Sequence, residues 1–268
     1  NCRGAANKPT VRDLVGMVKA TQTKILFLCE TRQSSEKIKR LRTRLGLRGF
    51  SGVSSNGLSG GLALFWCDSL HVEVQSSNDR YIDAYVRLSE HDPLWRLTCV
   101  YGEPCTENRH LMWTLMTSLK QQSDLPWCVM GDFNEAMWSF EHFSVTPRSE
   151  SQMLAFRDTL EVCELVDLGF SGLPFTYDNK QRGRKNVRVR LDRVVADNRW
   201  RDIFGEARVV HKVSPCSDHC PLMLQCVKEE TNHVRTNFRR YETFWERDES
   251  LPERVAEAWR SAGQQFSL

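Results

Sequence analysis

A carboxylate and a carboxamide stand two residues apart where a short apolar run of the chain ends. Residues 127–130, Trp-Cys-Val-Met, are followed by Gly131-Asp132-Phe133-Asn134. This pattern predicts a buried strand that delivers Asp132 and Asn134 on one side of its carboxyl end and Phe133 on the other. An Asp-x-Asn sequence alone is more often a turn that caps a helix, so the interpretation depends on the rest of the chain.

Further polar residues complete a set with these two: Asn1, Glu30, Tyr101, Thr176, Asp192, Asp218 and His219. Four members of the whole set are carboxylates, and four carboxylates that converged without basic partners would repel one another. We therefore expect a cation among them. All-oxygen ligands favour one Mg²⁺ or Mn²⁺ ion over zinc, and Glu30 is the first choice of ligand.

These residue types allow metal-assisted hydrolysis of a phosphate ester. Asp132 would orient or deprotonate a water, and Asn134 would hold that carboxylate or a phosphate oxygen. His219 would donate a hydrogen bond to the phosphoryl oxygen, with Asp192 fixing its imidazole. Acid–base assistance of this kind is worth about 10²–10⁴-fold. Tyr101 would bond the phosphate.

Each residue alone has a simpler explanation. A single glutamate such as Glu30 at a strand end is usually solvated, Asp218 can cap a turn, and Asp192 can belong to a surface ion-pair network. The joint occurrence favours one site, because several independent strand ends would otherwise have to imitate it by accident.

The composition is that of a soluble globular protein. The chain has 268 residues, 40% hydrophobic and 26% charged, with ten cysteines and a net charge of +3. We expect one large domain with an appendage, no membrane span, no signal peptide before Asn1 and a reducing compartment. Cys216, His219 and Cys220 offer zinc as an alternative, but their spacing fits no common zinc pattern.

Basic residues are concentrated in two segments. Residues 180–190 carry six and no acid, and residues 36–48 carry a second group on a predicted helix. A solvated surface is the alternative for the helix, and a polyanion-binding surface is the functional interpretation of both. The candidates for DNA contact are Arg182, Arg184, Lys185 and Arg188.

Periodicity predicts helices from Pro9, from Ser34, from Thr106 and over 151–163. It predicts strands over 24–29, 62–66, 71–88 (as a pair), 95–100, 127–130, 187–191, 209–213 and 220–227, and a Gly/Ser-rich loop over 51–61. The irregular interleaving favours an α/β fold, a four-layer sandwich of two mixed sheets packed face to face with helices outside.

The character of the chain changes after Val227. We expect a main domain over 1–227 and a connector over 228–268. The connector carries a Ser250-x-x-Glu253 capping box and aromatic residues spaced as in short amphipathic helices.

The order of the motifs resembles the endonuclease/exonuclease/phosphatase superfamily, which has the DNase-I-like fold. The matching phrases span residues 1 to about 227: Asn1-Cys2-Arg3-Gly4, Leu28-Cys29-Glu30-Thr31, Val100-Tyr101-Gly102, Gly131-Asp132-Phe133-Asn134, Leu191-Asp192-Arg193 and Ser217-Asp218-His219-Cys220-Pro221-Leu222. The chain is most similar to the apurinic-type endonuclease domain of plant LINE (non-LTR) retrotransposons. That similarity is carried by Asn-Cys-Arg-Gly, residues 175–179 and 190–193, and the tail around 239–245.

The resemblance implies a Mg²⁺-dependent nick in target DNA, whose 3′-hydroxyl primes a reverse transcriptase encoded downstream, and an intracellular, nuclear site of action. It also implies roles for the residues: Asn1 and Asn134 position substrate and nucleophile, Glu30 holds the metal, Tyr101, Thr176 and Ser217 contact phosphate, Asp132 activates water, and Asp192 and Asp218 support His219 and the metal site.

Two departures from the family's pattern give alternatives. Apurinic repair enzymes of this superfamily carry an aspartate where this chain has Arg3, so a second metal ligand is absent. The family's first central strand precedes Asn1, so its absence here would weaken the fold or the activity. The alternatives are an inactive remnant that retains nucleic-acid binding, and a phosphoesterase acting on another phosphate ester, such as a phosphoinositide or poly(A).

Overall fold

The computed structural model describes residues 1–226, except 6, 58, 215 and 216, together with 253, 254 and 256. The chain divides into two compact units, residues 1–229 and 230–268. The amphipathic helices predicted for the connector lie outside the described residues, apart from the helical residues 253, 254 and 256. The predicted boundary after residue 227 stays a prediction.

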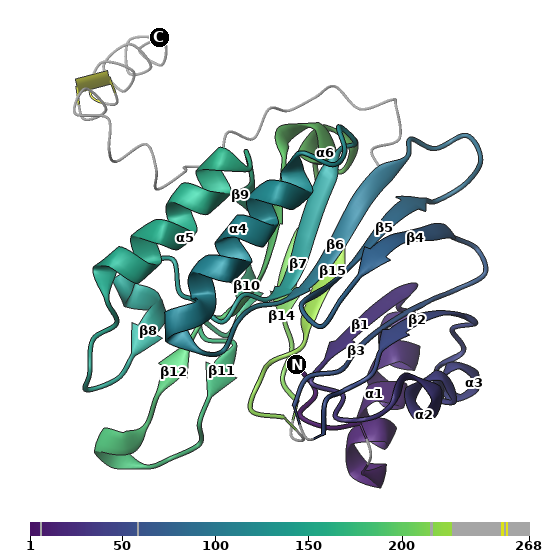
Figure 1. Cartoon of the computed structure of the whole chain (residues 1–268), viewed down its shortest axis with the longest axis horizontal. Coiled ribbons are helices and arrows are strands. Elements are labelled where there is room, and N and C mark those ends of the chain that lie inside the picture. The colour runs from purple at the N-terminus through teal and green to yellow at the C-terminus, as the bar shows by residue number, and fades with distance from the viewer. Residues whose placement is uncertain (6, 58, 215–216, 227–252, 255, 257–268) are drawn as a thin grey trace, which may run out of the picture. The chain divides into compact units, whose positions relative to one another are not determined.

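A six-stranded mixed sheet forms the centre of the first unit (Figure 1). Its order is β4 (His71–Ser77), β5 (Tyr81–Arg87), β6 (Trp95–Tyr101), β7 (Trp127–Asp132), β13 (Asp192–Ala196) and β9 (Val166–Asp167). The sheet is mixed because β6 and β7 run parallel whereas the other neighbours are antiparallel.

Two three-stranded sheets pack against one face of this sheet. One is β1 (Ile25–Cys29), β3 (Leu62–Trp66) and β2 (Gly49–Val53); the other is β10 (Ser171–Gly172), β14 (Arg208–His211) and β15 (Leu222–Gln225). Leu64, Ile82 and Val209, one from each sheet, belong to a single buried cluster. The two sheet layers therefore share one apolar core.

Helices cover the outer faces. α4 (Arg109–Lys120) and α5 (Glu150–Val162) pack on the six-stranded sheet through a second apolar cluster (Figure 1). α1 (Lys8–Thr21), α2 (Ser35–Lys39) and α3 (Leu41–Leu45) pack on the β1-β3-β2 sheet through a third. The predicted fold, two sheets face to face with helices outside, is confirmed. No helix in the described part of the chain is long and apolar enough to cross a membrane.

Smaller elements complete the unit. They are the 3₁₀ helices η1 (Thr106–Asn108), η2 (Ser139–Glu141) and η3 (Gly183–Lys185), the strands β8 (His142–Phe143), β11 (Tyr177–Asp178) and β12 (Arg188–Val189), and α6 (Asn198–Ile203). β11, β12 and β8 form a fourth small sheet.

The structure departs from the predicted elements at several segments, and β13 and α6 have no predicted counterpart. The Gly/Ser-rich loop begins later than expected, because Gly49–Val53 pairs with β3 as β2. The basic helix is two short helices that meet at Arg40. The strand predicted over 187–191 is reduced to Arg188–Val189, after which the next strand, β13, begins at Asp192.

The register of three central strands brings predicted site residues to one edge of the sheet. Asp132 is the pairing partner of Tyr101 across the β6–β7 pair and of Asp192 across the β7–β13 pair. Gly131 precedes it with φ +141°, and a Cβ there would lie 2.1 Å from the carbonyl oxygen of Val100. A glycine is therefore required for the strands to approach this closely.

A buried ion-pair network fixes the chain around Asp192. Arg193 pairs with Glu141 and Asp167 (both 2.7 Å), and Arg190 pairs with the same carboxylates (2.9 and 2.8 Å). Arg190 and Arg193 are 5% and 0% exposed, so they are not the surface network considered from the sequence. The network leaves Asp192 itself free to face the site.

We predict that Glu141→Gln lowers the free energy of unfolding by about 3–5 kcal/mol, because it leaves two buried guanidinium groups with only one of the two carboxylates that they share. Burial opposes ionisation of Glu141, but Arg193 and Arg190 together lower the pKa of its carboxyl group. The contribution of Glu141 is therefore complete above its unfolded pKa of about 4.3 and is lost as the pH falls through the lower folded value.

Urea denaturation at pH 7 and near pH 3 measures both effects. The exposed Glu90→Gln is the matched control and should stay within about 0.5 kcal/mol of the wild type. A loss for Glu141→Gln no larger than that of the control at pH 7 would contradict the role given to the network.

Candidate active site

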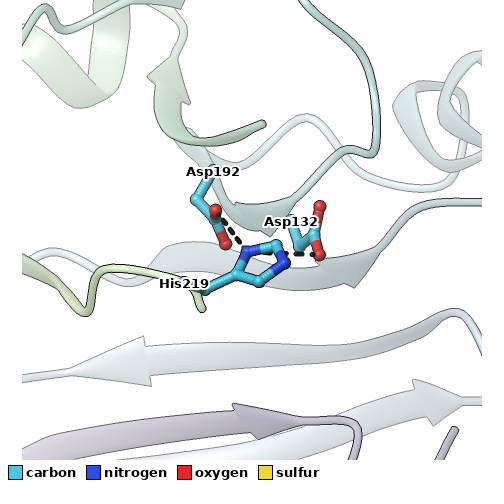
Figure 2. A group of neighbouring side chains, drawn as sticks. All are labelled: Asp132, Asp192 and His219. Atoms are coloured by element: carbon cyan, nitrogen blue, oxygen red, sulfur yellow. Dashed lines mark hydrogen bonds and ion pairs between the residues drawn. The ribbon is translucent and has the colours of Figure 1, made fainter. Parts of the chain in front are cut away.

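Asp132, Asp192 and His219 lie together (Figure 2). Asp132 ends β7 and Asp192 begins β13, and these two strands are neighbours in the six-stranded sheet. His219 Nδ1 is 2.8 Å from Asp192 Oδ2 and 3.8 Å from Asp132 Oδ2. All three side chains are buried. In the described part of the chain they are the one group of acidic, histidine or cysteine side chains with donor atoms close enough to hold a metal ion.

The environment separates the two aspartates chemically. Burial raises the pKa of Asp132, and the neighbouring Asp192 carboxylate acts in the same direction. Burial alone would raise the pKa of Asp192 too, but the charge and hydrogen bond of His219, with a smaller contribution from Thr176, lower that pKa. Burial disfavours the His219 imidazolium, yet Asp192 and then Asp132 raise its pKa. Asp192 and His219 therefore form an ion pair, and Asp132 is the stronger base of the two carboxylates.

Asn134 reaches the site through a turn. The strand β7 ends at Asp132, and Phe133 is buried as predicted. The predicted alternation of side chains between the two faces of the strand does not extend to Asn134, whose φ is +56°. The Asn134 backbone N–H donates to Asp132 Oδ1 (2.9 Å), and its carboxamide donates to the Gly102 carbonyl (2.9 Å). A left-handed backbone at a non-glycine residue stores strain that is typical of functional sites.

A buried glutamate that the sequence did not single out supports this turn. Glu135 is completely buried and pairs with Arg109 (2.6 Å) and with Arg148. Arg148 also donates to the Asn134 carbonyl oxygen (2.9 Å). The only sign in the sequence that Glu135 supports the site was its position next to Asn134, because the sequence does not distinguish a buried glutamate from an exposed one.

Glu30 collects three side-chain donors. Its Oε1 accepts from the Asn1 carboxamide (2.9 Å) and the Tyr101 hydroxyl (3.0 Å), and its Oε2 accepts from Arg32 (2.8 Å). Burial opposes ionisation, but these hydrogen bonds lower the pKa of Glu30. Asn1 also donates to Asp132 Oδ2 (3.2 Å), so it connects Glu30 to the aspartates.

Asp218 has a basic partner on one side only. Arg3 Nη1 lies 2.9 Å from its Oδ2, whereas its Oδ1 is buried without a hydrogen-bond partner among the described residues. Together with the Arg32 and His219 pairs, this corrects the expectation from the sequence that the carboxylates converge without basic partners. The reason is that Arg3 and Arg32 fold back onto neighbours that sequence distance does not reveal.

Two of the predicted phosphate-binding residues bond the backbone. Thr176 is fully buried, and its hydroxyl oxygen accepts from the N–H groups of Leu191 and Asp192 (2.9 Å each). The Ser217 hydroxyl donates to the Asn1 carbonyl and accepts from the His219 N–H (3.0 Å each). Both hold the chain beside the site, and their contacts with phosphate stay predictions.

The predicted DNA-contact residues lie on and beside the β11–β12 hairpin. Arg182, Arg184 and Lys185 are exposed at or beside η3, which connects the two strands. Arg188 is half-buried, with its guanidinium over the rings of Phe143 (4.5 Å) and Phe175 (5.4 Å). The exposed charges of Arg182, Arg184 and Lys185 are therefore accessible to a polyanion, whereas aromatic rings hold the guanidinium of Arg188 in place.

The zinc alternative gains no support from the described residues. Cys216 lies outside them, and the Cys220 thiol donates to the Phe175 carbonyl (3.7 Å). All cysteines in the described part of the chain are free.

Comparison with known proteins gives the family. The model of the endonuclease/exonuclease/phosphatase family matches residues 1–219. No curated protein matches the chain. Several solved structures share its fold. An AP endonuclease from Leishmania major is 16% identical, with a TM-score of 0.65 over 84% of this chain and 85% of that one.

Two further structures come from other nucleic-acid enzymes. The endonuclease domain of TRAS1, a telomere-specific non-LTR retrotransposon, is 17% identical, with a TM-score of 0.59 over 84% of this chain and 95% of that one. A 3′ phosphatase from Neisseria bound to a product DNA hairpin is 15% identical, with a TM-score of 0.63 over 85% and 97%. These likenesses describe the fold, and the family match covers most of the chain: this protein belongs to the endonuclease/exonuclease/phosphatase family of nucleases and phosphatases.

Proposed function

We propose that the chain is a divalent-metal-dependent phosphodiesterase that nicks DNA by attack of water on phosphorus. The observation that carries the proposal is the buried Asp132–Asp192–His219 group, whose two carboxylates have pKa values shifted in opposite directions. Such a split supplies one base and one fixed anion in a single site.

Glu30 and Asp218 are the residues that would hold the ion. Their carboxylates offer oxygen donors, which Mg²⁺ and Mn²⁺ prefer, and Asp218 Oδ1 is buried without a partner among the described residues. Asp192 Oδ2 and His219 Nδ1 are already bonded to each other (2.8 Å). A divalent ion held by these two carboxylates would neutralise the phosphate and polarise its ester oxygens.

The other residues then divide the reaction. Asp132 accepts the proton of the attacking water, and the Asn134 turn holds its carboxylate in place. The His219 imidazolium, fixed by Asp192, donates from its remaining ring nitrogen to the phosphoryl oxygen. Tyr101 and Asn1 orient Glu30. We propose that in-line attack forms the bond from the water oxygen to phosphorus and breaks the bond from phosphorus to the 3′ oxygen. The 3′ oxygen leaves with the electron pair of that bond and takes a proton from solvent to become the 3′-hydroxyl.

Two observations support DNA as the substrate. The exposed charges of η3 support a polyanion, and related folds include a retrotransposon endonuclease domain and an enzyme bound to a DNA hairpin. We propose that the chain is the endonuclease of a LINE-type element. It would act in the nucleus together with a reverse transcriptase module of the same polyprotein.

We predict that the protein nicks supercoiled plasmid in Mg²⁺ and that EDTA abolishes nicking. Asp132→Asn and His219→Ala should each lower the rate by about 10²–10⁴-fold, because each removes a proton-transfer or hydrogen-bonding group of the transition state. Asp124→Asn and His91→Ala change the same residue types at exposed positions and should leave the rate unchanged.

Persistent nicking in either site variant would mean that the roles are assigned wrongly. DNA binding without any metal-dependent nicking by the wild type would favour an inactive remnant. Cleavage of phosphoinositide or poly(A), but not of DNA, in a parallel substrate panel would favour a different phosphoesterase.

We predict that replacing Arg182, Arg184 and Lys185 by alanine weakens DNA binding and reduces its salt dependence. For every phosphate that the protein no longer neutralises, the slope of log K against log salt concentration becomes shallower by about 0.9. Lys37, Lys39 and Arg40, exposed at α2 and its C-terminal end, provide a matched triple alanine variant with the same charge change. Equal weakening of binding in both variants, measured by fluorescence anisotropy at several salt concentrations, would show that the hairpin has no special role.

A further inference from the structure

One guanidinium lies between the two carboxylates proposed to hold the metal. Arg3 Nη1 is 2.9 Å from Asp218 Oδ2, and Arg3 Nε is 4.0 Å from Glu30 Oε2. Glu30 and Asp218 come from distant parts of the sequence, and Arg3 is the residue that reaches both. Its positive charge therefore stands where a cation shared by these carboxylates would be bound.

The charges around this point already balance. Glu30 and Asp218 carry two negative charges, and Arg3 and Arg32 carry two positive charges at ion-pairing distance. A divalent ion that entered with Arg3 in place would give the group an excess of positive charge, which is unfavourable where the carboxylates are mostly shielded from water.

The Asp218 carboxylate nevertheless has capacity for another ligand. Its side chain is 9% exposed, and its Oδ1 has no hydrogen-bond partner among the described residues. A buried acceptor without a donor costs free energy of folding. Asp218 Oδ1 can therefore gain stability by binding another ligand, while Oδ2 is paired with Arg3.

The backbone of Arg3 is tethered, whereas its side chain is not. Arg3 has a left-handed backbone (φ +44°), and its N–H donates to Asn1 Oδ1 (3.2 Å). The N–H of the next residue, Gly4, donates to the Glu30 carbonyl oxygen (2.8 Å). The side chain is 47% exposed. The guanidinium can therefore leave for solvent by rotation of its side chain, without any change in the strands that carry the site.

We propose that Arg3 is an internal competitor of the divalent ion: its guanidinium neutralises Glu30 and Asp218 in the metal-free protein, and the ion binds only as Arg3 leaves. Arg3 thereby sets the metal affinity. This inference rests on the proposed function, because it takes Glu30 and Asp218 as the ligands.

Mn²⁺ binding to the full chain without DNA tests the proposal, with free Mn²⁺ measured by electron paramagnetic resonance. Arg3→Ala should bind Mn²⁺ at least about tenfold more tightly than the wild type, because the ion no longer has to displace a guanidinium from Glu30 and Asp218. Arg3→Lys keeps the charge and should stay within about threefold of the wild type. Glu30→Gln in either background should abolish the binding.

Arg48→Ala is the matched control, since it removes an arginine that is 84% exposed and paired with Asp68; it should leave the affinity unchanged. Circular dichroism melting verifies that each variant is folded. Unchanged or weaker binding by Arg3→Ala overturns the competitor role, as does an equal rise for Arg3→Lys, while leaving the metal site standing. No Mn²⁺ binding by either the wild type or Arg3→Ala overturns the proposed metal site and the competitor role together.

Discussion

Buried negative charge is the constraint on which this structure depends. Pairing of β7 with β13 sets Asp132 directly opposite Asp192, and both are almost inaccessible to water. Two carboxylates at that position cannot both be ionised without compensation. His219 provides it to Asp192, whereas burial and then the Asp192 carboxylate raise the pKa of Asp132. Burial and the repulsion between the two carboxylates, which both oppose folding, thus produce the difference in basicity on which the proposed chemistry depends.

The second pair of carboxylates meets the constraint differently. Glu30 and Asp218 are neutralised by guanidinium groups rather than by an imidazole. Asn1 joins the halves, with one carboxamide donating to Glu30 and to Asp132. We propose that the first half of the site transfers protons and that the second takes the cation. Buried groups adjacent in the chain hold two residues of the first half, Arg193 beside Asp192 and Glu135 beside Asn134.

The sequence was sufficient for the layers and for the end of β7 at Asp132, because an apolar run that stops at a polar residue marks a strand end. It grouped Asp132 with Asp192 and His219, although Asp192 begins β13 and does not end the strand predicted over 187–191. It failed where position depends on contacts between distant segments. The partners of Arg3 and Arg32, the burial of Arg190 and the backbone hydrogen bonds of Thr176 have no local signature. Asn134 was expected on an extended strand, because a left-handed turn is not distinguished by alternation of residue types.

The central claim is that water attacks phosphorus and that the bond to the 3′ oxygen breaks. Nicking an oligonucleotide duplex in H₂¹⁸O, followed by mass spectrometry of both products, measures it directly. We predict one ¹⁸O in the new 5′-phosphate and an unlabelled 3′-hydroxyl. Label in a 3′-phosphate, or a nick with no label in either product, would contradict this mechanism.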